Sequence, residues 1–137
     1  IECDQDLPTD EASAFDNCGE VTITSEDVIT DGECPQEYVV TRTFTATDDC
    51  GNASTAVQVI TVVDTTAPEF TSVPEDVTIE CDEEVPSMMA EATDNCGAVT
   101  VTSSDESVAG ECPQESVITR TFTATDECGN ASTATQV

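Results

Sequence analysis

The stretch TRTFTATDDCGNASTA spans Thr41–Ala56, and it decides the fold class of this chain. Threonine alternates with apolar residues over positions 42–47, a period of two that is typical of a strand packed on one face. The residues that follow, Asp48–Asn52, have the composition of a turn, and Gly51 can adopt the positive φ that other residues resist. The stretch therefore predicts a β-hairpin with Cys50 at its tip.

The same stretch returns at Thr119–Ala134 as TRTFTATDECGNASTA, with Glu127 in place of Asp49 as its one change. Residues 1–59 align with residues 79–137 without gaps, and 40 of the 59 positions are identical. An internal repeat of this fidelity, at an offset of 78 residues, indicates one small domain repeated along an array. We predict an N-terminally truncated repeat at 1–63 and a C-terminally truncated repeat at 64–137, with a connector at 64–74.

Other segments share this strand character. Val21–Thr24 and Val99–Thr102 alternate apolar and hydroxyl residues, and Val57–Val63 is a β-branched run. Strands this short and this closely spaced predict an all-β chain of two-sheet sandwiches. With four phenylalanines, one tyrosine and no tryptophan, the core of each repeat is expected to be thin.

Each copy carries four cysteines, and neighbouring cysteines lie 15 or 16 residues apart. An even number of cysteines in a small domain indicates disulfides formed in an oxidising compartment. Zinc is the competing explanation, but no two cysteines are close enough for the Cys-x2–4-Cys spacing of a zinc site. We therefore expect disulfide-linked domains outside the cell.

The charge balance excludes several classes of partner. The chain has 30 acidic residues, two arginines, no lysine and no histidine, for a net charge of −28. Nucleic acid needs a basic surface, and anionic lipid repels an acidic one. No apolar run approaches the ~20 residues of a membrane span. The lack of histidine removes the commonest general base, so we expect no enzymatic activity and no required cofactor.

Three motifs resemble one family. The sequences DNCG, TATDECGN and DTTAP are similar to those of hyalin-repeat (HYR) and HYR-like domains, above all the arrays of giant bacterial surface adhesins such as the SprB-like gliding adhesins of flavobacteria. This resemblance implies an immunoglobulin-like sandwich, a cell-surface location and service as a stalk or adhesive filament. General HYR domains tend to carry a cysteine in the last strand, and Ala53–Val59 has none, so their disulfide pattern does not transfer directly.

The implied sandwich nevertheless favours one of the three pairings open to each copy. In an immunoglobulin-like topology, Cys18 and Cys50 fall in loops at one end, whereas Cys3 and Cys34 fall toward the other. We predict the disulfides Cys3–Cys34 and Cys18–Cys50, with Cys81–Cys112 and Cys96–Cys128 as their copies.

The same topology brings a set of oxygen-bearing side chains toward the junction between repeats. Carboxylate and amide oxygens suit Ca²⁺, which takes 6–8 oxygen ligands, although the chain has no dedicated calcium motif. The candidate calcium ligands are Asp64, Asp94, Asn95, Asp126 and Glu127. Most other acids are expected to form a solvated surface.

Arg42 and Arg120 are the only side-chain cations and occupy equivalent positions. An arginine on a strand can cover apolar surface with its stem, but in so acidic a chain we favour a structural ion pair with an unspecified carboxylate. Short matches to glycosylation signals occur at Asn52, Asn130 and Thr65.

Taken together, these features predict a stalk segment of an extracellular adhesin or filament, with neighbouring repeats of the same chain as its first partners. Two alternatives stay open. In the first, the repeats themselves bind glycan or a surface weakly and gain strength through copy number, and in the second they pack laterally against other copies in a filament.

Overall fold

The computed structural model describes residues 1–137 and confirms an all-β chain, with eight strands and no helix. The chain divides into two compact units, Ile1–Asp64 and Thr65–Val137. This boundary lies one residue beyond the expected division between 63 and 64. The structure contains no helix long and apolar enough to cross a membrane.

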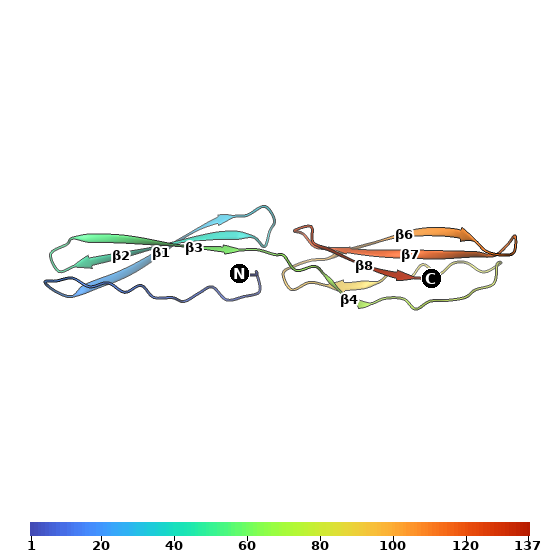
Figure 1. The fold of residues 1–137 in the computed structure, drawn as a ribbon, viewed down its shortest axis with the longest axis horizontal. Helices are drawn as coiled ribbons and strands as arrows, with labels where there is room; N and C mark the ends of the chain where they lie inside the picture. The colour runs from blue at the N-terminus through green and yellow to red at the C-terminus, as the bar shows by residue number, and fades with distance from the viewer. The chain divides into compact units, whose positions relative to one another are not determined.

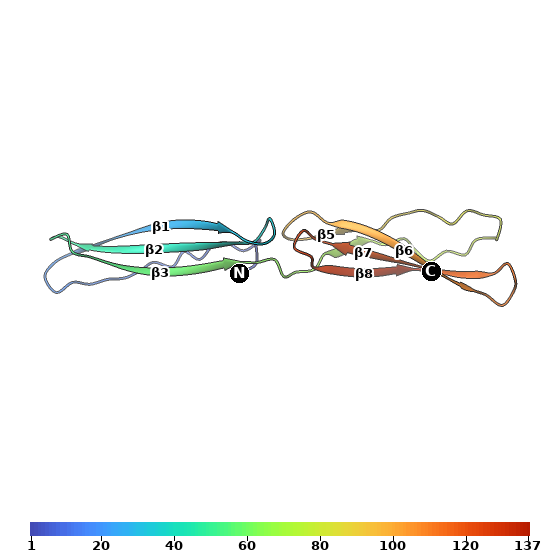
Figure 2. The same cartoon turned by 90° about the horizontal axis from the view of Figure 1, so that it is seen from above.

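The first unit is built on one antiparallel sheet in the order β1-β2-β3. Its strands are β1 (Val21–Asp31), β2 (Tyr38–Asp48) and β3 (Ala53–Val62), and Figure 2 shows them side by side. The first 20 residues contain no strand and run along one face of this sheet (Figure 1). A parallel bridge between Glu2 and Val63 fixes the start of this segment to the end of the sheet.

The second unit repeats this sheet and adds a second layer. Strands β6 (Thr100–Ala109), β7 (Ser116–Thr125) and β8 (Ala131–Gln136) form the sheet β6-β7-β8. A separate two-stranded sheet lies against one face of this sheet (Figure 1). It consists of β4 (Glu69–Ser72) and β5 (Glu91–Thr93), which pair antiparallel. The predicted two-sheet sandwich is thus found here, with a small second sheet, whereas the first unit has a sheet covered by extended chain.

The core of each unit is small, as the composition predicts. Val40, Ile60 and Val62 are buried in the first unit, and Ala90, Phe122 and Ala124 are buried in the second. On β7 buried and half-buried residues alternate from Phe122 to Thr125, which is the period-two pattern read from the sequence, whereas β2 is half-buried along its length apart from the buried Val40.

The predicted hairpin is present in both copies. Strands β2 and β3 pair from Thr47 and Ala53 back along their length, and the turn between them contains Gly51 at φ 87°. The equivalent Gly129 has φ 92°. These two glycines are the only residues with positive φ, so the turn uses the conformational freedom that glycine alone provides at low cost.

Candidate functional site

Four turns of the molecule share one construction, in which an aspartate accepts a hydrogen bond from the backbone N–H of a cysteine two residues later. The N–H groups of Cys18, Cys50, Cys96 and Cys128 donate to Asp16, Asp48, Asp94 and Asp126 over 2.7–2.9 Å. This is the local bonding that makes aspartate a turn residue. The repeated Asp-x-Cys pattern therefore positions every one of these cysteines by the same means.

The hairpin turn adds further donors to its aspartate. Asp48 Oδ1 also accepts the N–H of Asn52 at 2.8 Å, and its Oδ2 accepts the Asn52 side-chain amide at 2.7 Å. The Asn52 side chain, followed by the backbone donors, holds the pKa of Asp48 below its ordinary value. At Asp126 burial works to raise the pKa, but hydrogen bonds from Asn130 and the turn backbone outweigh it and lower the pKa.

The cysteines lie at the two ends of each sheet. In the first unit, Cys34 lies in the β1–β2 turn, at the end where the opening residues and Cys3 meet the end of β3. Cys50 lies in the β2–β3 turn at the opposite end, and Cys18 leads into β1 at that same end. The structure therefore brings each expected pair to a common end of its sheet.

Only half of the cysteines are in disulfides, which differs from the expectation that all eight would be. Cys3, Cys34, Cys96 and Cys128 are disulfide-bonded, whereas Cys18, Cys50, Cys81 and Cys112 are free and exposed. Cysteines that are bonded in one unit are free in the other at the equivalent position. The bonded Cys96 and Cys128, for example, are the copies of the free Cys18 and Cys50.

The free thiols of Cys18 and Cys50 lie in loops that touch. A Cβ atom placed on Gly19 would lie 3.2 Å from Oδ2 of Asp49, so the residue after one cysteine meets the residue before the other. The predicted Cys18–Cys50 disulfide stays a prediction, and this contact shows that its two loops are neighbours.

Both arginines form bidentate ion pairs within their own sheets. Nε and Nη2 of Arg42 donate to the two carboxylate oxygens of Asp27, each at 2.9 Å, and Nη1 donates to the carbonyl of Pro8. Arg120 repeats this with Asp105 at 2.7 and 2.8 Å and with the carbonyl of Pro86. The sequence did not predict which acidic residues pair with the arginines, although Asp27 and Asp105 occupy equivalent positions in the two repeats.

Each pair ties strand to strand and to the covering chain. Asp27 on β1 lies directly opposite Arg42 on β2, so the carboxylate and the guanidinium meet across one rung of the ladder. The third donor of the guanidinium reaches the segment that covers the sheet. The hydrogen bond from Arg42 lowers the pKa of Asp27, and the one from Arg120 lowers that of Asp105.

The candidate calcium ligands divide between the two units. In the second unit, Asp94 and Asp126 each bring a carboxylate oxygen within 4.8 Å of the other, and Oδ1 of Asp94 is buried without a hydrogen-bond partner. Asn95 and Glu127, in the same two turns, are exposed.

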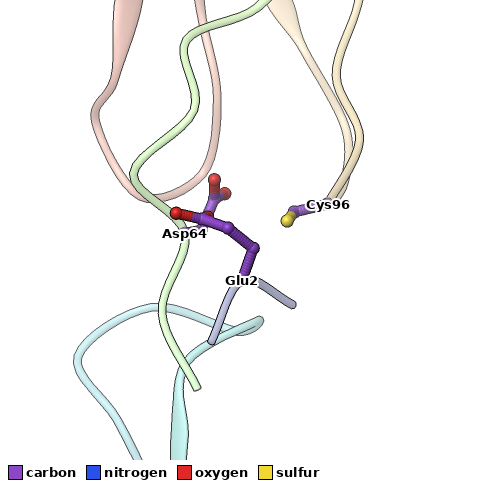
Figure 3. A group of neighbouring side chains, drawn as sticks. All are labelled: Glu2, Asp64 and Cys96. Carbon is purple, nitrogen blue, oxygen red and sulfur yellow. The ribbon is translucent and has the colours of Figure 1, made fainter. Parts of the chain in front are cut away.

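Asp64 closes the first unit and is 5% exposed. Its carboxylate lies within 4.8 Å of that of Glu2, which is not among the predicted ligands (Figure 3). Glu2 is placed there by its bridge to Val63, a pairing between chain ends that periodicity does not reveal. Figure 3 also labels Cys96, one of the two disulfide-bonded cysteines of the second unit.

The glycosylation matches have different surroundings. The side-chain amides of Asn52 and Asn130 donate to the aspartates of their own turns, Asp48 and Asp126, so the nitrogen that would carry a glycan is already engaged. Thr65 is exposed. Modification at these positions stays a prediction.

Comparison with known families now bears on this arrangement. Residues 70–137 match a family described as an HYR-like domain with 4 cysteines. This stretch resembles an HYR-like repeat. It contains Cys81, Cys96, Cys112 and Cys128, the number of cysteines that the family description gives.

No curated protein matches the chain. The first unit shares 40 of 59 positions with the HYR-like copy, including all four cysteines. HYR-like domains with disulfides are typical of extracellular proteins.

Proposed function

We propose that the chain is a stalk segment of an extracellular, cell-surface adhesin or filament, which it extends and rigidifies. The observation that carries this proposal is that the two units share the same stabilising features. The features that recur are structural contacts and turns, and not a binding pocket. The bidentate Arg–Asp pair, the Asp-x-Cys turns and the positive-φ glycine each appear at the same place in both copies.

These devices suit a load-bearing role. Each arginine links its own strand to one neighbouring strand and to the covering segment, and a disulfide prevents separation of the segments that it joins. In the chain-entropy model each predicted bridge contributes roughly 3–4 kcal/mol, a large share of the stability of a small domain. The acidic surface keeps a repetitive chain soluble at high copy number. A gliding adhesin of the SprB type is one protein in which such a stalk would serve.

Single-molecule pulling of the chain between end-attached handles tests the stalk role. Each bridge of the predicted pairing encloses about 30 residues, so it should withhold roughly 100 Å of extended chain. We expect two unfolding events whose extension increases after reduction with a thiol reagent. A mechanical role would be contradicted if the oxidised chain and the reduced chain both unfolded at forces no higher than those of a chain without disulfides.

The alternative function makes the repeats themselves adhesive. Pulling cannot distinguish the two, so the chain should also be tested on glycan arrays as a monomer and as a multivalent display. Binding that appears only on multivalent display would favour avidity-driven adhesion over a passive stalk. Lateral packing would instead appear as concentration-dependent assembly of the soluble chain.

We further propose that Ca²⁺ stabilises the array. Support comes from the paired carboxylates of Asp94 and Asp126 and from the buried oxygen of Asp94. A divalent cation would offset the repulsion between such carboxylates in a chain of net charge −28. The neighbouring Asn95 and Glu127 offer further oxygens, and Asp64 is the candidate ligand of the first unit.

A further inference from the structure

The three-stranded sheet of each unit has one covered face and one open face. The first 20 residues run along the covered face in the first unit, and β4 and β5 lie on it in the second (Figure 1). The other face (the outer face) comprises alternate positions of β1 from Thr22, of β2 from Val39 and of β3 from Ala53, and their copies in the second unit. On the flanking strands all of these positions are exposed, and this holds in the second unit too, where both covering strands are in place.

Threonine dominates the outer face. Strand register places Thr24, Thr45 and Thr55 side by side on one rung of the first sheet. The same rung recurs in the second unit, where it consists of Thr102, Thr123 and Thr133. Each threonine presents a methyl group and a hydroxyl group, so the face is a regular array of small, uncharged side chains.

The outer face is almost free of charge, although the chain is rich in acids. Of the 30 acidic residues, two lie on the outer faces, Glu26 in the first unit and Glu106 in the second. They are not copies of each other, because Ser104 is the copy of Glu26 and Val28 is the counterpart of Glu106. The two units therefore differ in sequence on this face but share its low charge.

The first unit also has an exposed apolar cluster on its outer face. Val28 and Val59 flank Thr41 on a single rung, and Val57 lies on the same face two residues before Val59. These three valines are 57–63% exposed. Adjoining apolar side chains that water can reach indicate an interaction surface. The outer face has no aromatic side chain on which a sugar ring could stack, so the cluster favours a protein partner over a glycan.

We propose that the outer face is a docking surface for a second copy of this chain, packed sheet against sheet. Two chains of net charge −28 repel each other, and the outer faces are where two copies meet with the fewest like charges. Sheets that pack face to face lie about 10 Å apart with interdigitated side chains, and small β-branched residues suit this packing. This goes beyond the stalk role and does not depend on it, since a chain that never associates could still bear load.

The geometry of the outer face makes it complementary to itself. Both copies present the same spacing of side chains, so the ridges of one face fit the grooves of the other in a symmetric dimer. Side chains on one face of a sheet repeat about every 4.8 Å across strands and about every 6.8 Å along them. The 15 positions of the first outer face therefore cover roughly 500 Å², and two such faces bury about 1,000 Å². This area is at the low end for specific interfaces, so we expect a weak contact that gains strength by repetition along an array.

Sedimentation equilibrium of the 137-residue chain at increasing NaCl concentration tests the proposal. We expect a monomer at low salt and a growing dimer fraction toward about 1 M NaCl, because salt screens the repulsion between acidic chains and leaves the apolar contact in place. An interface made of ion pairs would show the opposite dependence. Non-reducing electrophoresis of the same samples identifies any dimers that are linked by disulfides instead.

Valine methyl NMR spectra of a dilution series in high salt locate the contact. The signals of Val28, Val57 and Val59 should shift with concentration, because a second copy covers these side chains. The signals of Val40 and Val62, which are buried on the covered side of the same sheet, should stay in place. Concentration-dependent shifts that leave the three outer valines unchanged would overturn the proposal.

A pair of charge variants provides the matched control. Thr45→Glu with Thr123→Glu adds one acid to the middle of each outer face and should weaken the dimer at least about tenfold, because like charges would be buried against each other. Thr9→Glu with Ser87→Glu adds the same charge at equivalent exposed positions of the covering segments and should change the association by no more than about twofold. A chain that stays monomeric at every salt concentration would overturn the proposal, as would equal effects of the two variant pairs.

Discussion

Two glycines of this protein are required for different physical reasons. Gly51 sits at φ 87° with open space around its Cα, so a side chain there would meet no neighbour but would strain the backbone. Gly32 has no such φ, but a Cβ on it would lie 2.5 Å from Cβ of Glu37 across the β1–β2 turn. Gly51 is therefore required by its backbone conformation, and Gly32 is required by the close approach of Glu37.

We expect Gly51→Ala to lower the free energy of unfolding by about 1 kcal/mol, the usual cost of a left-handed residue other than glycine. Gly129→Ala should lower it to a similar extent, because that turn has the same bonding and a φ of 92°. Denaturant melts of both variants beside the parent chain provide the measurement. Unchanged midpoints would show that the turn relaxes to another conformation.

The ion pairs predict a pH dependence. The pKa of Asp27 is below its ordinary value of 3.8 in the folded chain, and its main cause is the hydrogen bond from Arg42. A depressed folded pKa stabilises the fold above pH 3.8, and this contribution is lost as the pH falls through the lower folded value. Arg42→Met should therefore destabilise the chain at pH 7 but cost progressively less toward pH 2.

Thermal melts of Arg42→Met and the parent chain from pH 2 to pH 7 test this sign. Arg120→Met provides the equivalent change in the second unit, where Asp105 also has a lowered pKa. A difference between variant and parent that is constant across the range would mean that the arginine acts through its apolar stem and not through its charge.

At the scale of the strand, the contribution of β4 can be isolated through one hydroxyl. Ser132 donates to the carbonyl of Pro68 and is half-buried, whereas its copy Ser54 is exposed. We expect Ser132→Ala to lower the free energy of unfolding by about 1 kcal/mol. Ser54→Ala should have an effect within about 0.5 kcal/mol.

Chemical denaturation of the two serine variants makes a direct comparison, because the substitution and the local sequence are the same. Equal losses in both would mean that the loss at Ser132 does not come from its hydrogen bond to Pro68. If neither substitution changed the free energy of unfolding, the hydrogen bond from Ser132 to Pro68 would contribute little to the stability of the second unit.

At the scale of the whole molecule, the oxidation state of the eight cysteines decides the stability of the chain. We expect protein made under oxidising conditions to contain four disulfides, Cys3–Cys34, Cys18–Cys50, Cys81–Cys112 and Cys96–Cys128. The two copies share their sequence around every cysteine, so a bridge that forms in one copy should form in the other. Peptide mapping of unreduced protein by mass spectrometry identifies the pairs directly.

The double variant Cys18→Ser with Cys50→Ser should then lose roughly 3–4 kcal/mol of stability under oxidising conditions. Under reducing conditions it should match the parent chain. Four thiols that stay reactive in fully oxidised protein would contradict the predicted bridges.

Calcium is the second property of the whole molecule that can be tested. We expect millimolar Ca²⁺ to raise the melting temperature by several degrees and a chelator to reverse the effect. Asp94→Asn should weaken this response, since asparagine can keep the turn bond to Cys96 but loses a charge. Asp16→Asn, the matched change in the first unit, controls for loss of charge, and NaCl of equal ionic strength controls for screening. A response equal in NaCl and Ca²⁺ would exclude specific binding.

The sequence alone determined everything that depends on local pattern. The alternation in TRTFTAT predicted β2 and β7, the DDCGN motif predicted the turn with its positive-φ glycine, and the 78-residue repeat predicted two units of the same kind. Local dihedral preferences and period-two burial act within a few residues, so a short stretch of sequence contains the information that they need.

Only the tertiary structure decided which distant residues meet. It paired Arg42 with Asp27 among many possible acids, brought Glu2 beside Asp64, and buried Phe122 fully while the identical Phe44 is half-buried. These outcomes depend on strand register and on which segment covers the sheet, and no local pattern specifies either. Two copies with the same strand sequence therefore differ in burial, because the layer above each sheet is supplied from elsewhere in the chain.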